Sequence, residues 1–100
     1  MSEQALSVAI TGALGNLGWK LMRQLAAHSA STRLVGLDNR SASTAQKEQL
    51  RQLAGDRSVD CVECDLADWS DYRWRDIIAE VEAVVHFAYR SPFPHDTWDD

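Results

Sequence analysis

Short apolar runs alternate with amphipathic runs from one end of the chain to the other. Four apolar runs are long enough for buried strands and cover residues 6–11, 33–38, 58–64 and 82–88. In three intervening stretches the apolar side chains recur at helical spacing, in residues 17–26, 40–55 and 68–81. The pattern therefore predicts the order β-α-β-α-β-α-β, followed by a loop from residue 89 that opens a further helix.

This order predicts an α/β fold. Strands that alternate with helices form a parallel sheet through right-handed crossovers, and the helices then cover both faces of the sheet. The second helix carries its own boundary signals, because Ser43 and Gln46 fit a capping box and Gly55 suits a helix C-terminus. We find no repeat, linker or low-complexity tract in the sequence, so residues 1–100 are expected to form one unit.

The charge balance argues against two classes of partner. The chain has a formal net charge of -5, and most of its fifteen acidic residues follow residue 59. Neither nucleic acid nor an anionic membrane is expected to bind such a chain. No apolar run has the length of a membrane span, and the N-terminus has no basic region before its apolar run. A soluble cytoplasmic protein is therefore expected.

The two cysteines, Cys61 and Cys64, form a C-x-x-C pair, a spacing that is found in redox and metal sites. In a strand, however, residues three apart point to opposite faces of the sheet. The sequence also has no second cysteine or histidine pair to complete a zinc site. We therefore expect two free thiols and no metal site.

Three of the five glycines, Gly12, Gly15 and Gly18, lie between the first predicted strand and the first predicted helix. In this setting the spacing G-x-x-G-x-x-G indicates a turn that binds a pyrophosphate. Gly12 allows a tight exit from the strand, Gly15 lets backbone amides approach a phosphate, and Gly18 lets the helix lie close to the sheet. The free N–H groups and the positive end of the helix dipole then face the ligand. A glycine turn that serves packing alone is the alternative.

Asp38 ends the second predicted strand, twenty residues after Gly18. A carboxylate at this place can accept two hydrogen bonds from the hydroxyls of an adenosine ribose, and it repels a 2′-phosphate. The sequence therefore favours NAD over NADP as the cofactor. Arg40 keeps NADP open, because its guanidinium could pair with that phosphate. Taken alone, Asp38 could also be an ordinary turn residue at a strand end.

The segments TGALGNLG, LDNR, CDLAD and VVHFA together resemble the short-chain dehydrogenase/reductase superfamily. The spacing T-G-x-x-G-x-x-G is similar to that of its extended branch, the NAD-dependent epimerase/dehydratase family. CVECDLAD and HFAYRSPFP look most like members related to uronate dehydrogenase. The resemblance implies a Rossmann-type sheet with strand order 3-2-1-4, an oxidoreductase or epimerase activity, NAD as cofactor and a small sugar-type substrate.

The resemblance also implies cofactor contacts for twelve residues. In the order pyrophosphate, adenosine ribose, adenine and nicotinamide side, these are Gly12, Gly15, Asn16, Leu17 and Gly18; Asp38, Asn39 and Arg40; Asp65 and Leu66; Phe87 and Ala88. Taken by itself, Asp65 could equally be an ordinary residue at a strand exit. His86 is a candidate general base, although a packed strand histidine is the favoured interpretation. Tyr89 and Arg90 leave the last strand and could reach a substrate.

The catalytic pair of this superfamily, a tyrosine with a lysine four residues later, is absent from the sequence. In such a pair the lysine lowers the pKa of the tyrosine, so that the phenol can exchange a proton with the substrate. The tyrosines here are Tyr72 and Tyr89, and the lysines are Lys20 and Lys47. The fourth strand is also apolar on both faces and is expected to have a further neighbour. We therefore assign no catalytic residue and interpret residues 1–100 as the N-terminal NAD-binding part of a longer enzyme, inactive alone.

Three hypotheses follow for the function. The leading one is the cofactor-binding part of an NAD-dependent epimerase, dehydratase or dehydrogenase with a sugar-type substrate, for which a homodimer is open at full length. The second is a non-catalytic redox sensor, which would keep the dinucleotide pocket and lack the catalytic pair. The third is a structural or interaction fragment that binds no nucleotide.

Overall fold

The computed structural model describes residues 6–28 and 33–88 of the chain. Its four strands are parallel and pair in the order β3-β2-β1-β4. The elements are β1 (Ser7–Thr11), α1 (Asn16–His28), β2 (Arg33–Asp38), α2 (Thr44–Ala54), β3 (Ser58–Glu63), α3 (Tyr72–Glu80) and β4 (Ala83–His86). The predicted element order and the predicted strand order 3-2-1-4 are both confirmed.

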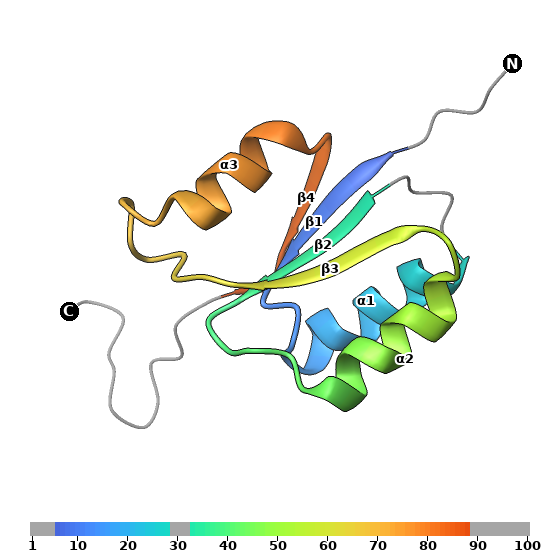
Figure 1. Cartoon of the computed structure of the whole chain (residues 1–100). Coiled ribbons are helices and arrows are strands. Elements are labelled where there is room, and N and C mark those ends of the chain that lie inside the picture. Colours follow the sequence, from blue (N-terminus) through green and yellow to red (C-terminus); the bar gives the residue numbers. More distant parts are fainter. Residues whose placement is uncertain (1–5, 29–32, 89–100) are drawn as a thin grey trace, which may run out of the picture.

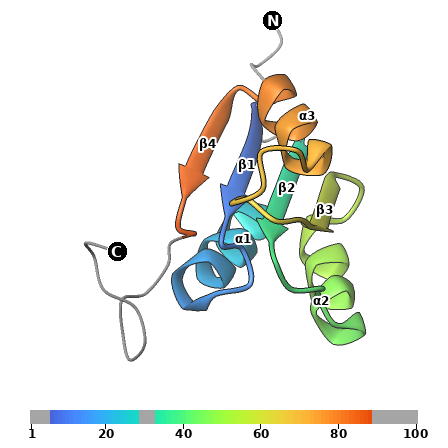
Figure 2. The same cartoon turned by 90° about the vertical axis from the view of Figure 1, so that its left-hand side faces the viewer.

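Helices cover both faces of the sheet, as predicted. Helices α1 and α2 lie on one face and α3 lies on the other (Figure 1 and Figure 2). On the α1/α2 face, Val8, Ile10 and Leu34 of the strands form a buried core with side chains of the two helices. Met22 of α1 and Leu50 of α2 are the largest buried helix side chains in that core.

The opposite face carries a smaller core. Ala9, Val35 and Leu37 are buried there, together with Cys64. Helix α3 adds only partly buried side chains, of which Trp74 is one. Successive residues of β1 and β2 therefore point to different cores, as expected for parallel strands that are covered on both faces.

Helix α2 begins and ends at the signals found in the sequence. The Ser43 hydroxyl accepts a hydrogen bond from Gln46 N–H at 3.1 Å, and the Gln46 side chain accepts one from Ser43 N–H at 2.9 Å. Gly55 follows the helix with a φ of 65°, and its N–H donates to the carbonyl of Arg51. The predicted capping box and glycine stop are thus confirmed. Within the described ranges no helix has both the length and the apolar character of a membrane span.

Cys61 and Cys64 are free thiols on opposite faces of the sheet, as predicted. Cys61 packs with the α1/α2 core, and Cys64, one residue beyond β3, packs with the α3 core. Burial, with a smaller contribution from the charge of Asp60, raises the pKa of the Cys61 thiol to about 11. Burial likewise raises the pKa of Cys64, so both thiols are poorly suited to redox chemistry. In the described part of the chain, no group of three His, Cys, Asp or Glu side chains is placed to hold a metal ion.

The carboxyl ends of the four strands meet at one edge of the sheet. Thr11 at the end of β1 pairs with Leu37 of β2 on one side and with His86 of β4 on the other. Asp38, the last residue of β2, pairs with Glu63 of β3. Ligands of open parallel sheets bind outside this edge, where the strand order reverses, and in this chain that point lies between β1 and β4.

Candidate functional site

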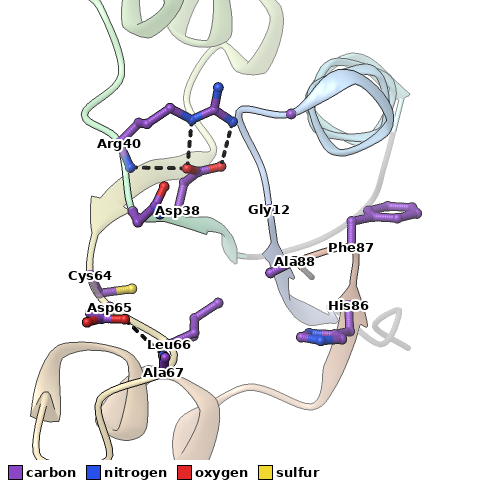
Figure 3. A pocket seen from close by; sticks show the side chains of 12 residues that line it. Gly12, Asp38, Arg40, Cys64, Asp65, Leu66, Ala67, His86, Phe87 and Ala88 are labelled. Atoms are coloured by element: carbon purple, nitrogen blue, oxygen red, sulfur yellow. Dashed lines mark hydrogen bonds and ion pairs between the residues drawn. The ribbon is translucent and has the colours of Figure 1, made fainter. Parts of the chain in front are cut away.

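A cavity of about 650 Å³ lies at the carboxyl edge of the sheet (Figure 3). Each of its four lining segments begins at or just after the end of a different strand. The lining residues are Gly12 and Gly15; Asp38, Asn39 and Arg40; Cys64, Asp65, Leu66 and Ala67; His86, Phe87 and Ala88. The fold thus brings into one cavity nine of the twelve residues predicted to contact a cofactor.

The other three predicted residues, Asn16, Leu17 and Gly18, do not line the cavity. Asn16 and Leu17 are exposed on the first turn of α1, and Gly18 is buried. Among the residues that the structure describes, no carbonyl oxygen outside the helix accepts a hydrogen bond from the N–H groups of residues 16–18. Such free N–H groups, at the positive end of the helix dipole, can bind an anion through the backbone. Their contact with a pyrophosphate stays a prediction.

The glycine turn is shaped by close backbone packing. Gly12 has a φ of 68°, and a Cβ there would lie 2.8 Å from the backbone nitrogen of Ala88. A Cβ on Gly18 would lie 2.0 Å from the carbonyl oxygen of Gly12. Gly18 therefore allows α1 to rest on the turn itself, whereas the sequence suggested an approach to the sheet. A Cβ on Gly15 would find more room, 3.3 Å from the same carbonyl oxygen.

Asp38 forms the part of the wall nearest the turn, and its carboxylate is surrounded by donors. Its side chain is 6% exposed. Oδ2 accepts hydrogen bonds from Leu14 N–H at 2.9 Å and from Nη2 of Arg40 at 3.3 Å. Oδ1 accepts from the backbone N–H and from Nε of Arg40, each at 3.1 Å. These four bonds fill the acceptor positions that a carboxylate offers.

Burial by itself would raise the pKa of Asp38. The hydrogen bond from the Arg40 guanidinium, together with those from the Leu14 and Arg40 N–H groups, outweighs burial and places this pKa below its usual value. The same pairing raises the pKa of Arg40. At neutral pH the cavity therefore contains a buried, ionised carboxylate paired with a guanidinium whose side chain is 60% exposed.

Thr11 joins the carboxyl ends of β1 and β4. Its hydroxyl oxygen accepts hydrogen bonds from the N–H groups of Phe87 at 3.0 Å and Ala88 at 3.2 Å. The same oxygen lies 2.6 Å from Nδ1 of His86. Because this oxygen already accepts two bonds, we assign the Thr11 hydroxyl as the donor and Nδ1 of His86 as the acceptor. The imidazole hydrogen is then on Nε2. Together these bonds hold the Phe87–Ala88 backbone against Gly12.

His86 lines the cavity, although the sequence favoured a packed strand histidine. The side chain is exposed, because β4 has no neighbour on its outer side in the described part of the chain. Tyr89 and Arg90, which were also considered as substrate contacts, lie outside the described residues. Cys64 and Ala67 line the cavity as well and were missed, although they directly flank the predicted Asp65–Leu66 pair.

The loop that carries Asp65 and Leu66 is shaped by its own hydrogen bonds. Oδ1 of Asp65 accepts a bond from Ala67 N–H at 3.0 Å, and its carbonyl accepts one from Asp68 N–H at 3.0 Å. Leu66 is half-buried and packs against the α3 core. The Asp65 carboxylate is exposed, so its visible role in the structure is to hold the loop.

Asp71 holds the same loop from outside the cavity. Its carboxylate accepts a hydrogen bond from Asp65 N–H at 2.7 Å, and it caps α3 by accepting one from Arg73 N–H at 3.1 Å. The Arg73 guanidinium adds bonds of 2.9 Å and 2.8 Å. Asp71 was not among the residues predicted from the sequence. Two signals were available: an aspartate that precedes an amphipathic run, and the spacing D-x-R that Asp71 shares with Asp38.

The sequence profile described as "NAD dependent epimerase/dehydratase family" matches residues 8–100. The chain belongs to this family. The resemblance found in the sequence motifs is therefore confirmed, and a dinucleotide is the ligand class that membership of the family supports. The search of curated proteins finds no match.

Solved structures share the fold. Uronate dehydrogenase from Agrobacterium tumefaciens, a mutant complexed with NAD, is 24% identical with a TM-score of 0.62, over 90% of this chain and 30% of that one. A C2-type ketoreductase from a modular polyketide synthase is 22% identical with a TM-score of 0.62, over 99% of this chain and 24% of that one. At these identities the likeness shows the Rossmann-like fold of the family. The chain spans less than a third of the length of either structure.

Proposed function

We propose that the chain is the NAD-binding part of a dehydrogenase or epimerase that acts on a sugar-type substrate related to a uronate. The cavity supports this proposal because it combines a glycine turn, a buried carboxylate and a small residue, Ala88, at the carboxyl edge of the sheet. The observation that carries the proposal is the 2.9 Å hydrogen bond from Leu14 N–H to Asp38. Through this bond the glycine turn and the carboxylate are held in one fixed arrangement.

In the proposed complex the pyrophosphate is bound by the N–H groups of residues 16–18, beside Gly15. Asp38 accepts hydrogen bonds from the adenosine ribose, with Asn39 and Arg40 beside it. The adenine ring lies against Leu66, and the nicotinamide-side ribose lies along Phe87 and Ala88. Bound NAD would supply hydride transfer, whereas the residues of this chain bind and orient it.

NAD is favoured over NADP because of the charge of Asp38. The pKa of this carboxyl is lowered, so it is ionised at neutral pH, and its side chain is 6% exposed. A 2′-phosphate beside it would place two negative charges close together, in a site where water screens them poorly.

The proposal assigns cofactor binding and no catalytic residue to residues 1–100. Neither Tyr72 nor Tyr89 has a lysine four residues later. The proton transfer and the substrate contacts are then supplied by a part of the protein outside this sequence. Because α1 and the turn form the phosphate site through backbone atoms, NAD binding itself can be tested on this chain.

The test is calorimetry with NAD on the folded chain and on its Gly15→Ala variant. We expect NAD to bind the chain. In Gly15→Ala the added methyl group projects beside the turn and displaces a charge-assisted contact, so we expect NAD affinity to fall by about tenfold or more. Gly55→Ala is the matched control. It adds the same methyl at a residue with a φ of 65° and no atom within 4 Å of the new Cβ, so it should reduce stability without changing NAD affinity.

Absence of any binding heat from a chain that circular dichroism shows to be folded would overturn the proposal and favour the third hypothesis. NAD binding by the longer protein with no turnover of sugar acids or nucleotide sugars would instead favour the redox sensor. Oxidation of a uronate with reduction of NAD, followed at 340 nm, would support the enzyme.

A further inference from the structure

All four acceptor positions of Asp38 are taken by hydrogen bonds within the chain. Two donors are backbone N–H groups, those of Leu14 and Arg40, which belong to the turn and to the exit of β2. The other two are Nε and Nη2 of the Arg40 guanidinium. An adenosine ribose needs acceptor positions on this carboxylate for its two hydroxyl groups. Something must therefore leave Asp38 before the ribose can be bound.

The guanidinium is the donor that can leave. The two backbone N–H groups are fixed by the fold, because Leu14 lies in the glycine turn and Arg40 lies two residues after the end of β2. The Arg40 side chain, by contrast, is 60% exposed, and within the described residues its guanidinium donates hydrogen bonds to Asp38 alone. Rotation about its side-chain bonds frees one acceptor position on each carboxylate oxygen and leaves both backbone bonds in place.

The guanidinium also lies where a dinucleotide would cross the cavity. Its Nη2 is 3.8 Å from the place that a Cβ on Gly15 would occupy. Figure 3 shows the Arg40 side chain reaching from the Asp38 wall toward the glycine turn. The side chain therefore covers the boundary between the proposed ribose site and the proposed pyrophosphate site.

We propose that Arg40 is a specificity-determining gate over Asp38: its guanidinium competes with the adenosine ribose of NAD, and NAD binds by displacing it. The inference rests on the proposed function, NAD binding. Once displaced, the guanidinium stays within reach of the ribose, where it can pair with a 2′-phosphate. Arg40 therefore weakens the binding of NAD and strengthens that of NADP. As a result the preference for NAD over NADP is smaller than Asp38 alone would produce.

The free energy needed to displace the Arg40 guanidinium from Asp38 is expected to be small. A pair with one exposed partner adds little to stability, because water and dissolved salt screen its charges. Displacing it should cost NAD about two- to fivefold in affinity, and this cost should shrink as the salt concentration rises.

The experiment measures the dissociation constants of NAD and NADP by calorimetry for the chain and for Arg40→Ala. We expect Arg40→Ala to bind NAD about two- to fivefold more tightly and to bind NADP about tenfold more weakly, since the second value reflects a lost charge-assisted bond to phosphate. Arg73→Ala is the matched control. It breaks an Asp-x-Arg pair of the same hydrogen-bond pattern outside the cavity, so it should tighten neither cofactor.

Arg40→Lys provides the second variant. A lysine keeps the positive charge but cannot make the two parallel bonds of a guanidinium, so it should bind NAD more tightly than the wild type and retain NADP binding. Circular dichroism and thermal unfolding establish that each variant is folded. If Arg40→Ala is not folded, Arg40→Lys decides the question by the same comparison.

The experiment distinguishes a failure of the gate from a failure of the proposed function. If the wild type binds NAD and a folded Arg40 variant binds it equally or more weakly, the gate is overturned and the proposed function stands. If the wild type and all variants fail to bind NAD, the proposed function itself is overturned. Tighter NAD binding in Arg73→Ala as well as in Arg40→Ala would also overturn the gate, since the effect would not depend on the cavity.

Discussion

The chain builds one hydrogen-bond arrangement twice, at Asp38–Arg40 and at Asp71–Arg73. In each pair a buried carboxylate accepts the N–H of the residue two positions later and two bonds from its guanidinium. In each, the remaining bond comes from a backbone N–H group, that of Leu14 in the distant glycine turn for Asp38 and that of Asp65 in the preceding loop for Asp71.

The two pairs differ in where the fold puts them. Asp38 ends a strand, so its carboxylate lies at the edge where the cavity forms. Asp71 precedes a helix and holds the cavity loop from behind, and it does not line the cavity. The comparison teaches that a local motif fixes the conformation of a pair, whereas the position of the pair in the sheet decides whether its carboxylate can meet a ligand.

The most direct test of this difference is to remove each carboxylate in turn and measure the affinity for NAD. Asp38→Ala removes both proposed ribose contacts, so we expect NAD affinity to fall by about a hundredfold, the equivalent of about 3 kcal/mol. Asp71→Ala removes no proposed ribose contact and only loosens the loop that carries Asp65, so its effect on NAD affinity should be smaller. Calorimetry on both folded variants checks this. Equal losses would mean that the position of the pair is irrelevant.

A smaller effect is expected on thermal stability, and here Asp71 should matter more than Asp38. Asp71→Ala removes the cap of α3 and the acceptor for Asp65 N–H together, so we expect the thermal midpoint to fall by several degrees. Asp71→Ser keeps a capping hydroxyl and loses the ion pair, so it should recover part of the loss. Thermal unfolding followed by circular dichroism measures both. An unchanged midpoint in Asp71→Ala would contradict the role assigned to this residue.

The smallest expected effect is the acid dependence of the two pairs. Hydrogen bonds from the Arg73 guanidinium and from Asp65 N–H hold the pKa of Asp71 well below its usual range, whereas at Asp38 burial is the largest single cause and offsets more of the lowering. A lowered pKa means that each carboxylate stabilises the fold fully above the unfolded value, about 3.9, and less as the pH falls through the folded value.

At neutral pH we expect Asp71→Asn and Asp38→Asn to unfold at lower temperatures than the wild type. The difference in thermal midpoint should shrink for each variant as the pH falls below about 4. The convergence should be larger for Asp71→Asn, because its pKa shift is larger. Thermal midpoints between pH 7 and pH 2 test the order. A wild-type advantage that grows on acidification would have the wrong sign.

Much of the fold could be predicted because its signals are local. The bounds of β2 agree with the apolar run at residues 33–38, and the capping box of α2 was visible from Ser43 and Gln46. The predicted third and fourth strands ran too far. Cys64 and Phe87 follow the strand ends, because at this edge the chain leaves the sheet to form the cavity wall.

The candidate site was harder to complete for a physical reason. Spacing relative to the glycines indicated Asp38, but the four donors around its carboxylate come partly from a turn more than twenty residues away. Likewise, the D-x-R spacing at Asp71 was present in the sequence, but that spacing does not indicate the bond that Asp71 accepts from Asp65 N–H in the preceding loop.

By itself the sequence determined the order of the elements, the glycine turn and the family, because hydrophobic periodicity and backbone freedom act over a few neighbouring residues. Tertiary structure alone decided that Leu14 N–H of the glycine turn binds Asp38, that Thr11 ties β4 to β1, and that Gly12 lies against Ala88. Those contacts depend on strand register and helix packing, which place residues far apart in the chain within a hydrogen bond of one another.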